Sequence, residues 1–396
     1  MSLRGADRLG GRAAIAGIGA TEFSKDSGRS ELKLAVEAVR AAIADAGLRP
    51  ADVDGLVTFT MDTSPEITVA QAAGIGELSF FSRVHYGGGA ACATVQQAVM
   101  AVATGVAEVV VCYRAFNERS GRRFGAGVQH REPSAEGAAL GVNLPAGLLT
   151  PASWVAVAAQ RYLHAYHLDA SVFGHVAVAD RRHAARNPAA YFYGEPITLA
   201  EHAASRWIVE PLRLLDCCQE TDGGQALVVT SAERARDLAH APAVVRAAAQ
   251  GAGRRQEQMT SFYRDADDLV TLPEMGVVAR QLWRTSGLGP ADIDVAVLYD
   301  HFTPYVLMQL EEFGFCGRGE GGAFVAENRL PFNTHGGQLG EAYLHGMNGI
   351  AEAVRQLRGQ SVNQVPGAAH VLVTAGAGVP TSGLLLGADG VDGADG

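Results

Sequence analysis

The chain of 396 residues is 48% hydrophobic and 19% charged, a composition typical of a globular protein, and it is long enough for two fused α/β domains. Its formal net charge of −10, with no long basic run, argues against nucleic acid as a partner. It contains no stretch of about 18 apolar residues and no apolar signal segment, so we expect a cytoplasmic protein without a membrane span.

Alternating strands and helices are predicted for the first part of the chain. Apolar residues at helical spacing in 31–46 predict an amphipathic helix, and the small, apolar stretch 93–104 predicts a buried one. Short runs rich in β-branched and aromatic residues predict the strands, at residues 14–18, 57–59, 80–84 and 109–112.

Residues 116 to about 205 break this rhythm. They are rich in Arg, His, Pro and aromatic residues, and they include a predicted helix at 154–167. We interpret them as an insertion that covers one face of the first half. The segment 226–229 then returns to the core.

The second part of the chain repeats the alternation. Helices are predicted at 274–283, 304–313 and 349–357, and strands at 295–299 and 370–373. The last residues, 387–396, are mostly Gly, Ala and Asp, and they predict a disordered tail.

The chain contains one passage twice. Residues 47–54 (Gly-Leu-Arg-Pro-Ala-Asp-Val-Asp) return as 287–294 (Gly-Leu-Gly-Pro-Ala-Asp-Ile-Asp), each after a helix and before a strand. Gly suits the position just past a helix, and Pro prevents its continuation. Residues 107–111 likewise match 369–373. We therefore predict a duplicated α/β fold with halves at 1–235 and 236–390, and a site between them.

Cysteine and lysine usage limits the chemistry. None of the five cysteines stands in a Cys-x-x-Cys pair, so neither a zinc ribbon nor a disulfide framework is indicated, and we predict no metal site. The only lysines are Lys25 and Lys33, which we expect to be solvated. Schiff-base chemistry needs a buried amine and is therefore not expected.

Cys92 follows the glycine-rich turn 87–89 at the start of the predicted buried helix. A helix N-terminus lowers the pKa of a thiol and favours thiolate, which suggests a reactive group. The alternative is a small cysteine packed in the core.

Two later segments place polar side chains at the ends of strands or beside glycines. Tyr299, Asp300 and His301 follow a predicted strand, where α/β sheets bind ligands, although Asp300 could simply cap the next helix. The stretch 336–349 has five glycines, and Tyr343 and His345 lie within it. Glycine there indicates close approach to a ligand, with a flexible surface loop as the alternative.

Arginines in the insertion are candidate phosphate contacts. They comprise Arg122 and Arg123, and the run Arg181, Arg182 and His183 with Arg186. A solvated face is the alternative for each.

Together these segments resemble the thiolase superfamily, and within it the thiolase-like half of sterol carrier protein x and the lipid-transfer-protein-type thiolases. The resemblance covers nearly the whole chain and includes 205–217, 221–224 and 300–303. It implies a five-layer αβαβα fold. Cys92 stands where the nucleophilic cysteine of working thiolases belongs.

Two other thiolase positions differ. Tyr343 stands where the histidine of the Gly-His-Pro motif belongs, and Thr374 or its neighbour replaces the second cysteine. Tyr299 stands where relatives often have histidine. Tyrosine, with a pKa near 10, is a poor base for thiolysis but a good donor to a developing oxyanion.

These differences are similar to those of the acyl-CoA retro-aldolases of steroid side-chain degradation. That resemblance implies a carbon–carbon lyase that cleaves a β-hydroxyacyl-CoA into a ketone and a shorter acyl-CoA. It also implies a small OB-fold partner and a homodimer, with coenzyme A as part of the substrate and no other cofactor.

On this interpretation, Tyr299 and Tyr343 are base and acid in an order left open, and His301 tunes them or donates to the oxyanion. Substrate-binding positions are expected at Cys92, His345, Gly336, Gly337, Arg122, Arg123 and Arg182. Two alternatives remain: a thiolase or acyltransferase with Cys92 as nucleophile, and a non-catalytic subunit that binds lipid or acyl-CoA.

Overall fold

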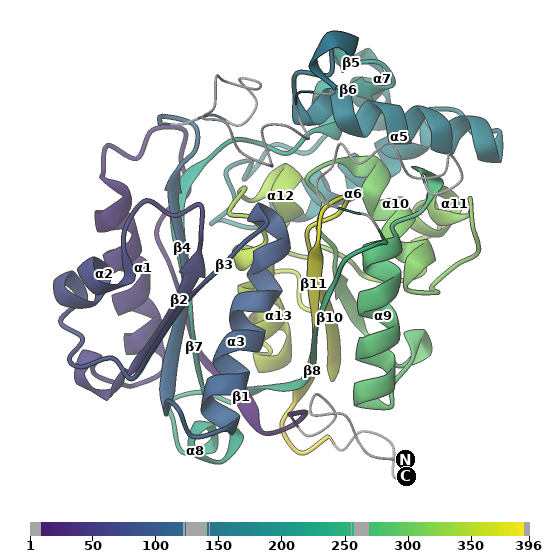
Figure 1. Cartoon of the computed structure of the whole chain (residues 1–396). Helices are drawn as coiled ribbons and strands as arrows, with labels where there is room; N and C mark the ends of the chain where they lie inside the picture. Colours follow the sequence, from purple (N-terminus) through teal and green to yellow (C-terminus); the bar gives the residue numbers. More distant parts are fainter. Residues whose placement is uncertain are drawn as a thin grey trace.

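The computed structural model describes residues 9–121, 123, 141, 143–254, 256 and 269–391. Strands and helices alternate through both parts of the chain, and an inserted helical region lies between them (Figure 1). The first part contains β1 (Ala13–Ala20), α1 (Glu31–Asp45), β2 (Gly55–Phe59), α2 (Glu66–Ala73), β3 (Phe80–Val84), α3 (Ala91–Ala103), β4 (Val109–Asn117), β7 (Asp222–Ser231) and α8 (Ala232–Arg236). The insertion contains α5 (Pro151–Tyr166), α6 (Val172–Ala184), α7 (Leu199–Ala204), β5 (Trp207–Val209) and β6 (Leu212–Arg213). The second part contains β8 (Ala243–Gly251), α9 (Pro273–Ser286), β9 (Val295–Val297), α10 (Thr303–Glu312), α11 (Gly321–Ala326), α12 (Gly337–Gly340), α13 (Met347–Arg358), β10 (His370–Ala375) and β11 (Thr381–Ala388).

Nine strands form one mixed sheet in the order β3-β2-β4-β7-β1-β8-β11-β10-β9. β1 pairs with β8 over only two residue pairs, Ala14 with Val244 and Ile15 with Ala243. The sheet therefore consists of two half-sheets that meet at a narrow seam.

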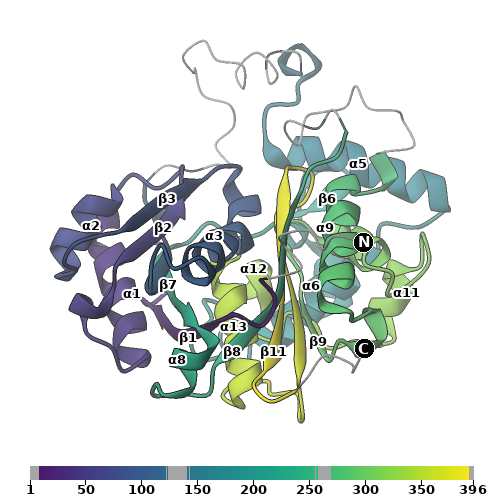
Figure 2. The ribbon, with the colours of Figure 1, turned by 60° about the horizontal axis from the view of Figure 1, so that its bottom comes forward.

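Helices α3 and α13 lie between the two half-sheets (Figures 1 and 2). Their apolar side chains, such as Val95 and Ile350, share one core with inner residues of both half-sheets. A second core lies beneath α1 and α2, and a third beneath α9 and α10. The predicted five-layer αβαβα fold is therefore confirmed. Such layering is stable because helices cover both faces of each half-sheet.

The two copies of the repeated passage share their backbone geometry. Gly47 and Gly287 both have φ of 73°, the left-handed conformation that glycine adopts without strain just past a helix. The carboxylate of Asp54 accepts from the backbone N–H groups of Glu108 and Val109.

In the second copy, Asp294 accepts in the same way from Ala369 and His370. Gly55 is paired with Val110, and Val295 with Val371. Val371 therefore corresponds to Val110, whereas the sequence match aligned it with Val109, so that match was wrong by one residue. Two runs of similar apolar residues can be aligned in more than one register. The Asp carboxylate and the strand pairing identify the correct one.

Some predicted element ends differ from the structure. The strand predicted to 299 ends at Val297, because the next two N–H groups donate to side chains, Leu298 to Asn333 and Tyr299 to Thr374. The predicted tail was placed too early: β11 reaches Ala388, and Gly387 is paired with His370. Residues 392–396 lie outside the described residues.

The insertion was predicted to cover one face of the first half, but it packs against the second half instead. Tyr162 of α5 and Phe173 of α6 belong to the core that contains Leu307 and Met308 of α10, in the second half. Burial of these side chains on α10 and α11 explains why the insertion packs there. Among the described residues, no helix is both long and apolar enough to cross a membrane.

Candidate active site

Two tyrosine hydroxyls lie together near the carboxyl end of β9. Tyr299 follows β9, Tyr343 lies between α12 and α13, and their Oη atoms are 3.1 Å apart. Tyr299 is buried and Tyr343 is partly buried. The Tyr343 N–H donates to the Thr221 hydroxyl over 2.8 Å, and that hydroxyl donates back to the Tyr343 carbonyl. The structure thus brings together the two predicted tyrosines.

A closed set of side chains holds the backbone of Tyr299. Its N–H donates to Thr374 Oγ1 over 2.9 Å, and its carbonyl accepts from Gln309 Nε2 over 2.8 Å. Thr374 in turn donates to Gln309 Oε1 over 2.6 Å. Thr374 therefore positions a tyrosine in this chain; it or its neighbour was predicted to replace the second thiolase cysteine.

A glycine from the first half of the chain lies directly against the Tyr299 hydroxyl. A Cβ atom added to Gly88, in the turn before α3, would lie 1.8 Å from Tyr299 Oη. Only glycine admits the tyrosine hydroxyl at this point. The site is thus formed between the two halves.

His345 lies beside Tyr343, with ring centroids 4.7 Å apart, and has a positive φ of 53°. Such a backbone conformation costs free energy in a non-glycine residue and is concentrated at functional sites. His345 Nδ1 lies 3.4 Å from Arg114 Nε. Burial and the Arg114 charge hold the pKa of His345 well below its usual value, so the imidazole is neutral.

Arg114 is a fully buried cation beneath the site. It forms an ion pair with buried Asp62 and stacks over Phe116 at 4.4 Å. The Thr58 hydroxyl also donates to Asp62. Buried charges need partners of this kind, because an unpaired one costs several kcal/mol.

His301 is enclosed by aromatic rings. Its ring lies 4.8 Å from that of Tyr299 and 5.3 Å from that of Tyr305. Burial lowers the pKa of His301 to about 3, and its Nδ1 atom has no hydrogen-bond partner among the described residues. His301 is therefore a neutral and weakly basic imidazole beside the tyrosine pair.

Burial raises the pKa of both tyrosines, and the nearby Glu118 and Cys218 raise it further. Glu118 is 2% exposed, and its Oε2 atom has no hydrogen-bond partner in the described part of the chain. Burial also raises the pKa of Glu118 well above its usual value. The tyrosine hydroxyls are therefore protonated at neutral pH.

Cys92 lies in the core that α3 and α13 share with both half-sheets. Its thiol is 0% exposed and lies 3.8 Å from the backbone carbonyl of Val373. Burial raises the pKa of Cys92, so the prediction of a lowered pKa at the helix N-terminus was wrong in this fold. The alternative of a small cysteine in the core describes the position.

Asp300 and the glycines after it form internal contacts. Asp300 accepts from the N–H groups of Gln338 and Leu339, and thereby caps α12 rather than the helix that directly follows it. A Cβ on Gly337 would lie 2.0 Å from Asp300 Oδ2, and one on Gly336 would lie 2.6 Å from Ala184 Cβ. Both glycines thus admit protein atoms, and their contact with a ligand stays a prediction.

The predicted phosphate-binding arginines are dispersed. Arg123 donates to Glu220 over 2.7 Å, next to the Thr221 that holds Tyr343, whereas Arg122 lies outside the described residues. Arg182 of α6 donates to Asn328 over 3.1 Å, and no described contact joins it to the tyrosines.

Lys25 was predicted to be solvated, but it is partly buried. Its Nζ atom donates to the Glu220 carbonyl over 2.7 Å and lies 4.4 Å from the centre of the Tyr191 ring. Burial lowers the pKa of Lys25 to about 8. The bridge between Ser24 and Asp222 places Lys25 there, and local sequence does not indicate that contact.

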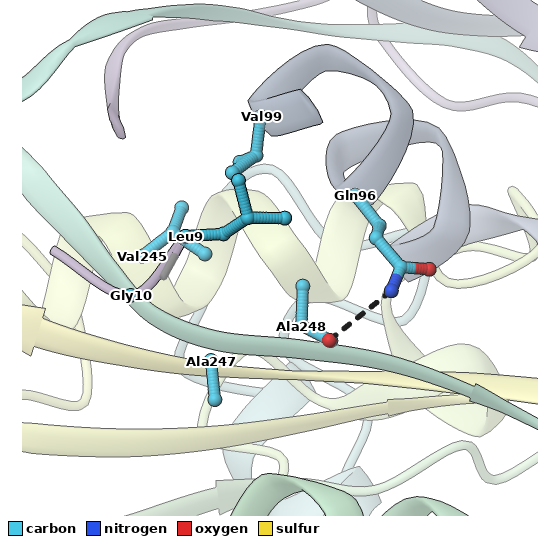
Figure 3. Close-up of a pocket in the computed structure, with 7 residues that line it drawn as sticks. All are labelled: Leu9, Gly10, Gln96, Val99, Val245, Ala247 and Ala248. Carbon is cyan, nitrogen blue, oxygen red and sulfur yellow. Dashed lines mark hydrogen bonds between the residues drawn. The ribbon is translucent and has the colours of Figure 1, made fainter. Parts of the chain in front are cut away.

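Other features contribute little to the site. The described residues contain no group of three or more His, Cys, Asp or Glu side chains that could hold a metal ion. A small apolar cavity between α3 and β8 has no titratable side chain in its lining, and Gln96 at its edge donates to the Ala248 carbonyl (Figure 3).

Sequence reasoning missed Arg114, Asp62, Glu118 and Thr221. A signal for Arg114 was present, because it interrupts the apolar run 109–116, and a charge inside a buried strand needs a partner. Thr221 lies in the stretch 221–224 that carries the family resemblance but was not predicted as a site residue, and Glu118 gave no comparable signal.

Comparisons with known proteins show which families this chain resembles. Residues 256–385 match a family described as thiolase C-terminal domain-like. The chain is 68% identical to a steroid side-chain-cleaving aldolase of Thermomonospora curvata, over 96% of this chain and 99% of that protein. It is 66% identical to a 17-hydroxy-3-oxo-4-pregnene-20-carboxyl-CoA lyase of Mycobacterium tuberculosis, over 96% and 100%.

Solved structures give the same picture. An Ltp2-ChsH2(DUF35) aldolase superposes with a TM-score of 0.93 at 67% identity, over 97% of this chain and 99% of that one. A human mitochondrial 3-ketoacyl-CoA thiolase superposes with a TM-score of 0.68 at 14% identity, over 96% and 98%, which indicates a shared fold only.

Proposed function

This chain belongs to the thiolase-like family of steroid side-chain-cleaving aldolases, and on that premise we propose that the hydroxyls of Tyr299 and Tyr343 transfer the protons of its reaction. The chain is a carbon–carbon lyase that cleaves a β-hydroxyacyl-CoA of a steroid side chain by a retro-aldol reaction. The observation that carries the assignment is the 3.1 Å contact between the two hydroxyls.

The retro-aldol reaction is redox-neutral. One group accepts the proton of the β-hydroxyl, the Cα–Cβ bond breaks, and its electron pair moves into the thioester as an enolate. The former carbinol carbon becomes a ketone, and a proton returns to the enolate carbon to give the shorter acyl-CoA. Because both hydroxyls are protonated, the pair can accept that proton only as it delivers its own proton to the enolate carbon, so the two transfers are linked and need no cofactor beyond the coenzyme A of the substrate.

The two neutral imidazoles beside the tyrosine pair are suitable hydrogen-bond donors to the enolate oxygen. His301 and His345 are held neutral by burial, so each imidazole can donate one N–H without adding charge. We assign the enolate oxygen to these donors, and a phosphate of coenzyme A to Arg123. The acid and base roles stay assigned to the tyrosine pair as a unit.

Cys92 supports the aldolase over an acyl-enzyme mechanism. A nucleophilic thiol must reach the thioester and ionise, whereas this thiol is fully buried with a raised pKa. The third possibility, a non-catalytic subunit, gives no reason for two hydroxyls in contact beside two neutral imidazoles.

We also propose a homodimer and a hetero-complex with a small OB-fold partner. The solved Ltp2-ChsH2(DUF35) aldolase of 67% identity includes a DUF35 component. β3 is an edge strand of the sheet, and its Phe81 is 58% exposed, which favours strand pairing between two copies. Sedimentation of the chain alone and with its partner tests both assemblies. We propose the cytoplasm as the location.

The test is to replace each tyrosine by phenylalanine. With a β-hydroxyacyl-CoA that carries a tertiary hydroxyl, and with the partner present, we expect kcat to fall about 10²- to 10⁴-fold for Tyr299→Phe and Tyr343→Phe, with KM nearly unchanged. Tyr193→Phe, at an exposed position, is the matched control. Unchanged turnover in both site variants would exclude the assignment.

A further inference from the structure

Arg114 of β4 lies against one ring nitrogen of His345. Its Nε atom and a terminal nitrogen of the guanidinium are both 3.4 Å from His345 Nδ1. A guanidinium has N–H donors and no acceptor, so a proton on Nδ1 would point at other protons. His345 Nδ1 is therefore the acceptor of this contact.

The position of the ring proton follows from the charge of His345. Burial and the Arg114 charge hold the pKa of His345 well below its usual value, so the imidazole carries a single proton. Because Nδ1 accepts from Arg114, that proton lies on Nε2. This tautomer makes Nε2 a hydrogen-bond donor.

Neighbouring rings hold the imidazole in this orientation. The Phe59 ring lies 6.2 Å from it, edge to face, and the Tyr343 ring lies 4.7 Å from it. If the imidazole turned over, its Cδ2–H group would face Arg114, and the guanidinium would lose its acceptor. A buried donor without a partner costs free energy, so the cation itself opposes the turn.

The Nε2 atom of His345 faces the glycine turn before α3. A Cβ atom added to Gly87 would lie 3.9 Å from His345 Nε2. One added to the next residue, Gly88, would lie 1.8 Å from Tyr299 Oη, which is 3.1 Å from Tyr343 Oη. The N–H of His345 and the two tyrosine hydroxyls are therefore grouped at the same turn.

Arg114 is held on its other side by a carboxylate. It is 0% exposed, forms an ion pair with buried Asp62 and stacks over Phe116 at 4.4 Å. Apolar side chains of similar volume often stabilise a fold as well as a buried ion pair does, or better. Stability alone therefore does not account for a cation at this position.

We propose that Arg114 is a positioning residue of the retro-aldol reaction, which holds His345 as the Nε2-protonated tautomer so that a neutral N–H faces the enolate oxygen. The inference rests on the proposed function, which assigns that oxygen to the imidazoles. His345 donates a hydrogen bond and transfers no proton, so no bond forms or breaks at the ring. The Arg114 charge also strengthens this N–H as a donor in a buried region.

The arrangement is the reverse of that in a histidine that acts as a general base. In such a histidine, Nδ1–H donates to a carboxylate or a backbone carbonyl, and Nε2 is left as the acceptor. Here a cation at Nδ1 gives the opposite tautomer and lowers the basicity of the ring. His345 can thus stabilise negative charge on the substrate, whereas its protonated Nε2 atom cannot accept a proton from it.

The first test uses the unmodified chain in complex with its partner, isotopically labelled at the histidine ring nitrogens. NMR distinguishes a protonated ring nitrogen from an unprotonated one. His345→Asn identifies the His345 signals by their loss, and asparagine tolerates the positive φ at this position. We expect a proton on Nε2 and none on Nδ1. A proton on Nδ1, alone or together with one on Nε2, would overturn the proposal.

A second test asks whether Arg114 acts through His345. Asp62→Asn and Arg114→Gln are made together, so that no carboxylate is left buried without its cation. We expect kcat for retro-aldol cleavage to fall about tenfold with KM nearly unchanged. This is less than the roughly 10²- to 10³-fold cost of losing one oxyanion donor, because the productive tautomer remains accessible. In the His345→Asn background, the same two substitutions should cost no more than about twofold.

Equal losses in both backgrounds would indicate a purely structural role for Arg114 and contradict the proposal, as would no loss in the parent. The matched control is Asp45→Asn with Arg358→Gln, which removes a 2.9 Å ion pair at the end of α13 farthest from His345. Its kcat should stay within about threefold of the parent value. The NMR test needs no turnover, so the tyrosine-to-phenylalanine variants report separately whether the proposed function fails.

Discussion

A single methyl group at Gly88 should separate the two tyrosine hydroxyls without changing any titratable group. The added Cβ of Gly88→Ala would lie 1.8 Å from Tyr299 Oη and 2.3 Å from its Cζ atom. Ordinary contact begins near 3.4 Å, so the hydroxyl must move by about 1.6 Å. That shift breaks its 3.1 Å contact with Tyr343.

The expected cost is mainly catalytic. Displacement of a reacting group by about 1 Å costs roughly 10²-fold in rate, so we expect kcat for retro-aldol cleavage to fall about 10²- to 10³-fold. Overpacking should lower the free energy of unfolding by about 1–3 kcal/mol. Steady-state kinetics and thermal unfolding measure the two effects separately.

Gly76→Ala is the matched control, because a Cβ there meets no atom within 4 Å. It should leave kcat and Tm nearly unchanged. If Gly88→Ala turned over substrate within about threefold of the parent rate, contact between the tyrosines could not be required for catalysis, and the reasoning would be refuted.

Three further outcomes are expected. Cys92→Ala should keep kcat within about threefold, because its thiol is buried with a raised pKa; a 10²-fold loss, or an acyl-enzyme seen by intact mass, would restore the nucleophile. Arg114→Met should cost about 3–5 kcal/mol in denaturant unfolding, since it leaves the Asp62 carboxylate buried without its cation; a cost below about 1 kcal/mol would contradict this. His301 has a folded pKa of about 3, below its value near 6.5 in the unfolded chain, so the unfolded chain binds more protons between these values and stability falls as pH drops below about 6.5. The loss at pH 4.5 should be about 2–3 kcal/mol and should shrink in His301→Asn; an equal pH slope in both proteins would show that His301 is not responsible.

The duplicated fold could be predicted because its signals are local. Gly47 and Gly287 each end a helix in the left-handed conformation, and a Pro-Ala-Asp turn follows both. These features depend on residues within one turn of the chain, where glycine and proline restrict the backbone directly. The strand order and the correspondence between Val110 and Val371 could not be predicted, because they depend on pairing between distant strands.

The candidate site, like the fold, has features that could be predicted from the sequence and features that depend on tertiary contacts. The sequence predicted that Tyr299 lies near the end of a strand and that Tyr343 lies among glycines, and its resemblance to thiolases implied that Tyr343 stands in place of their histidine. Tertiary contacts bring their hydroxyls together, bury Cys92 and partly bury Lys25, and none of these outcomes could be predicted from the sequence. The physical reason is that burial and proximity depend on groups far apart in sequence. Loss of hydration then reverses what a residue's type and immediate neighbours suggest, as it does for the pKa of Cys92 and of Lys25.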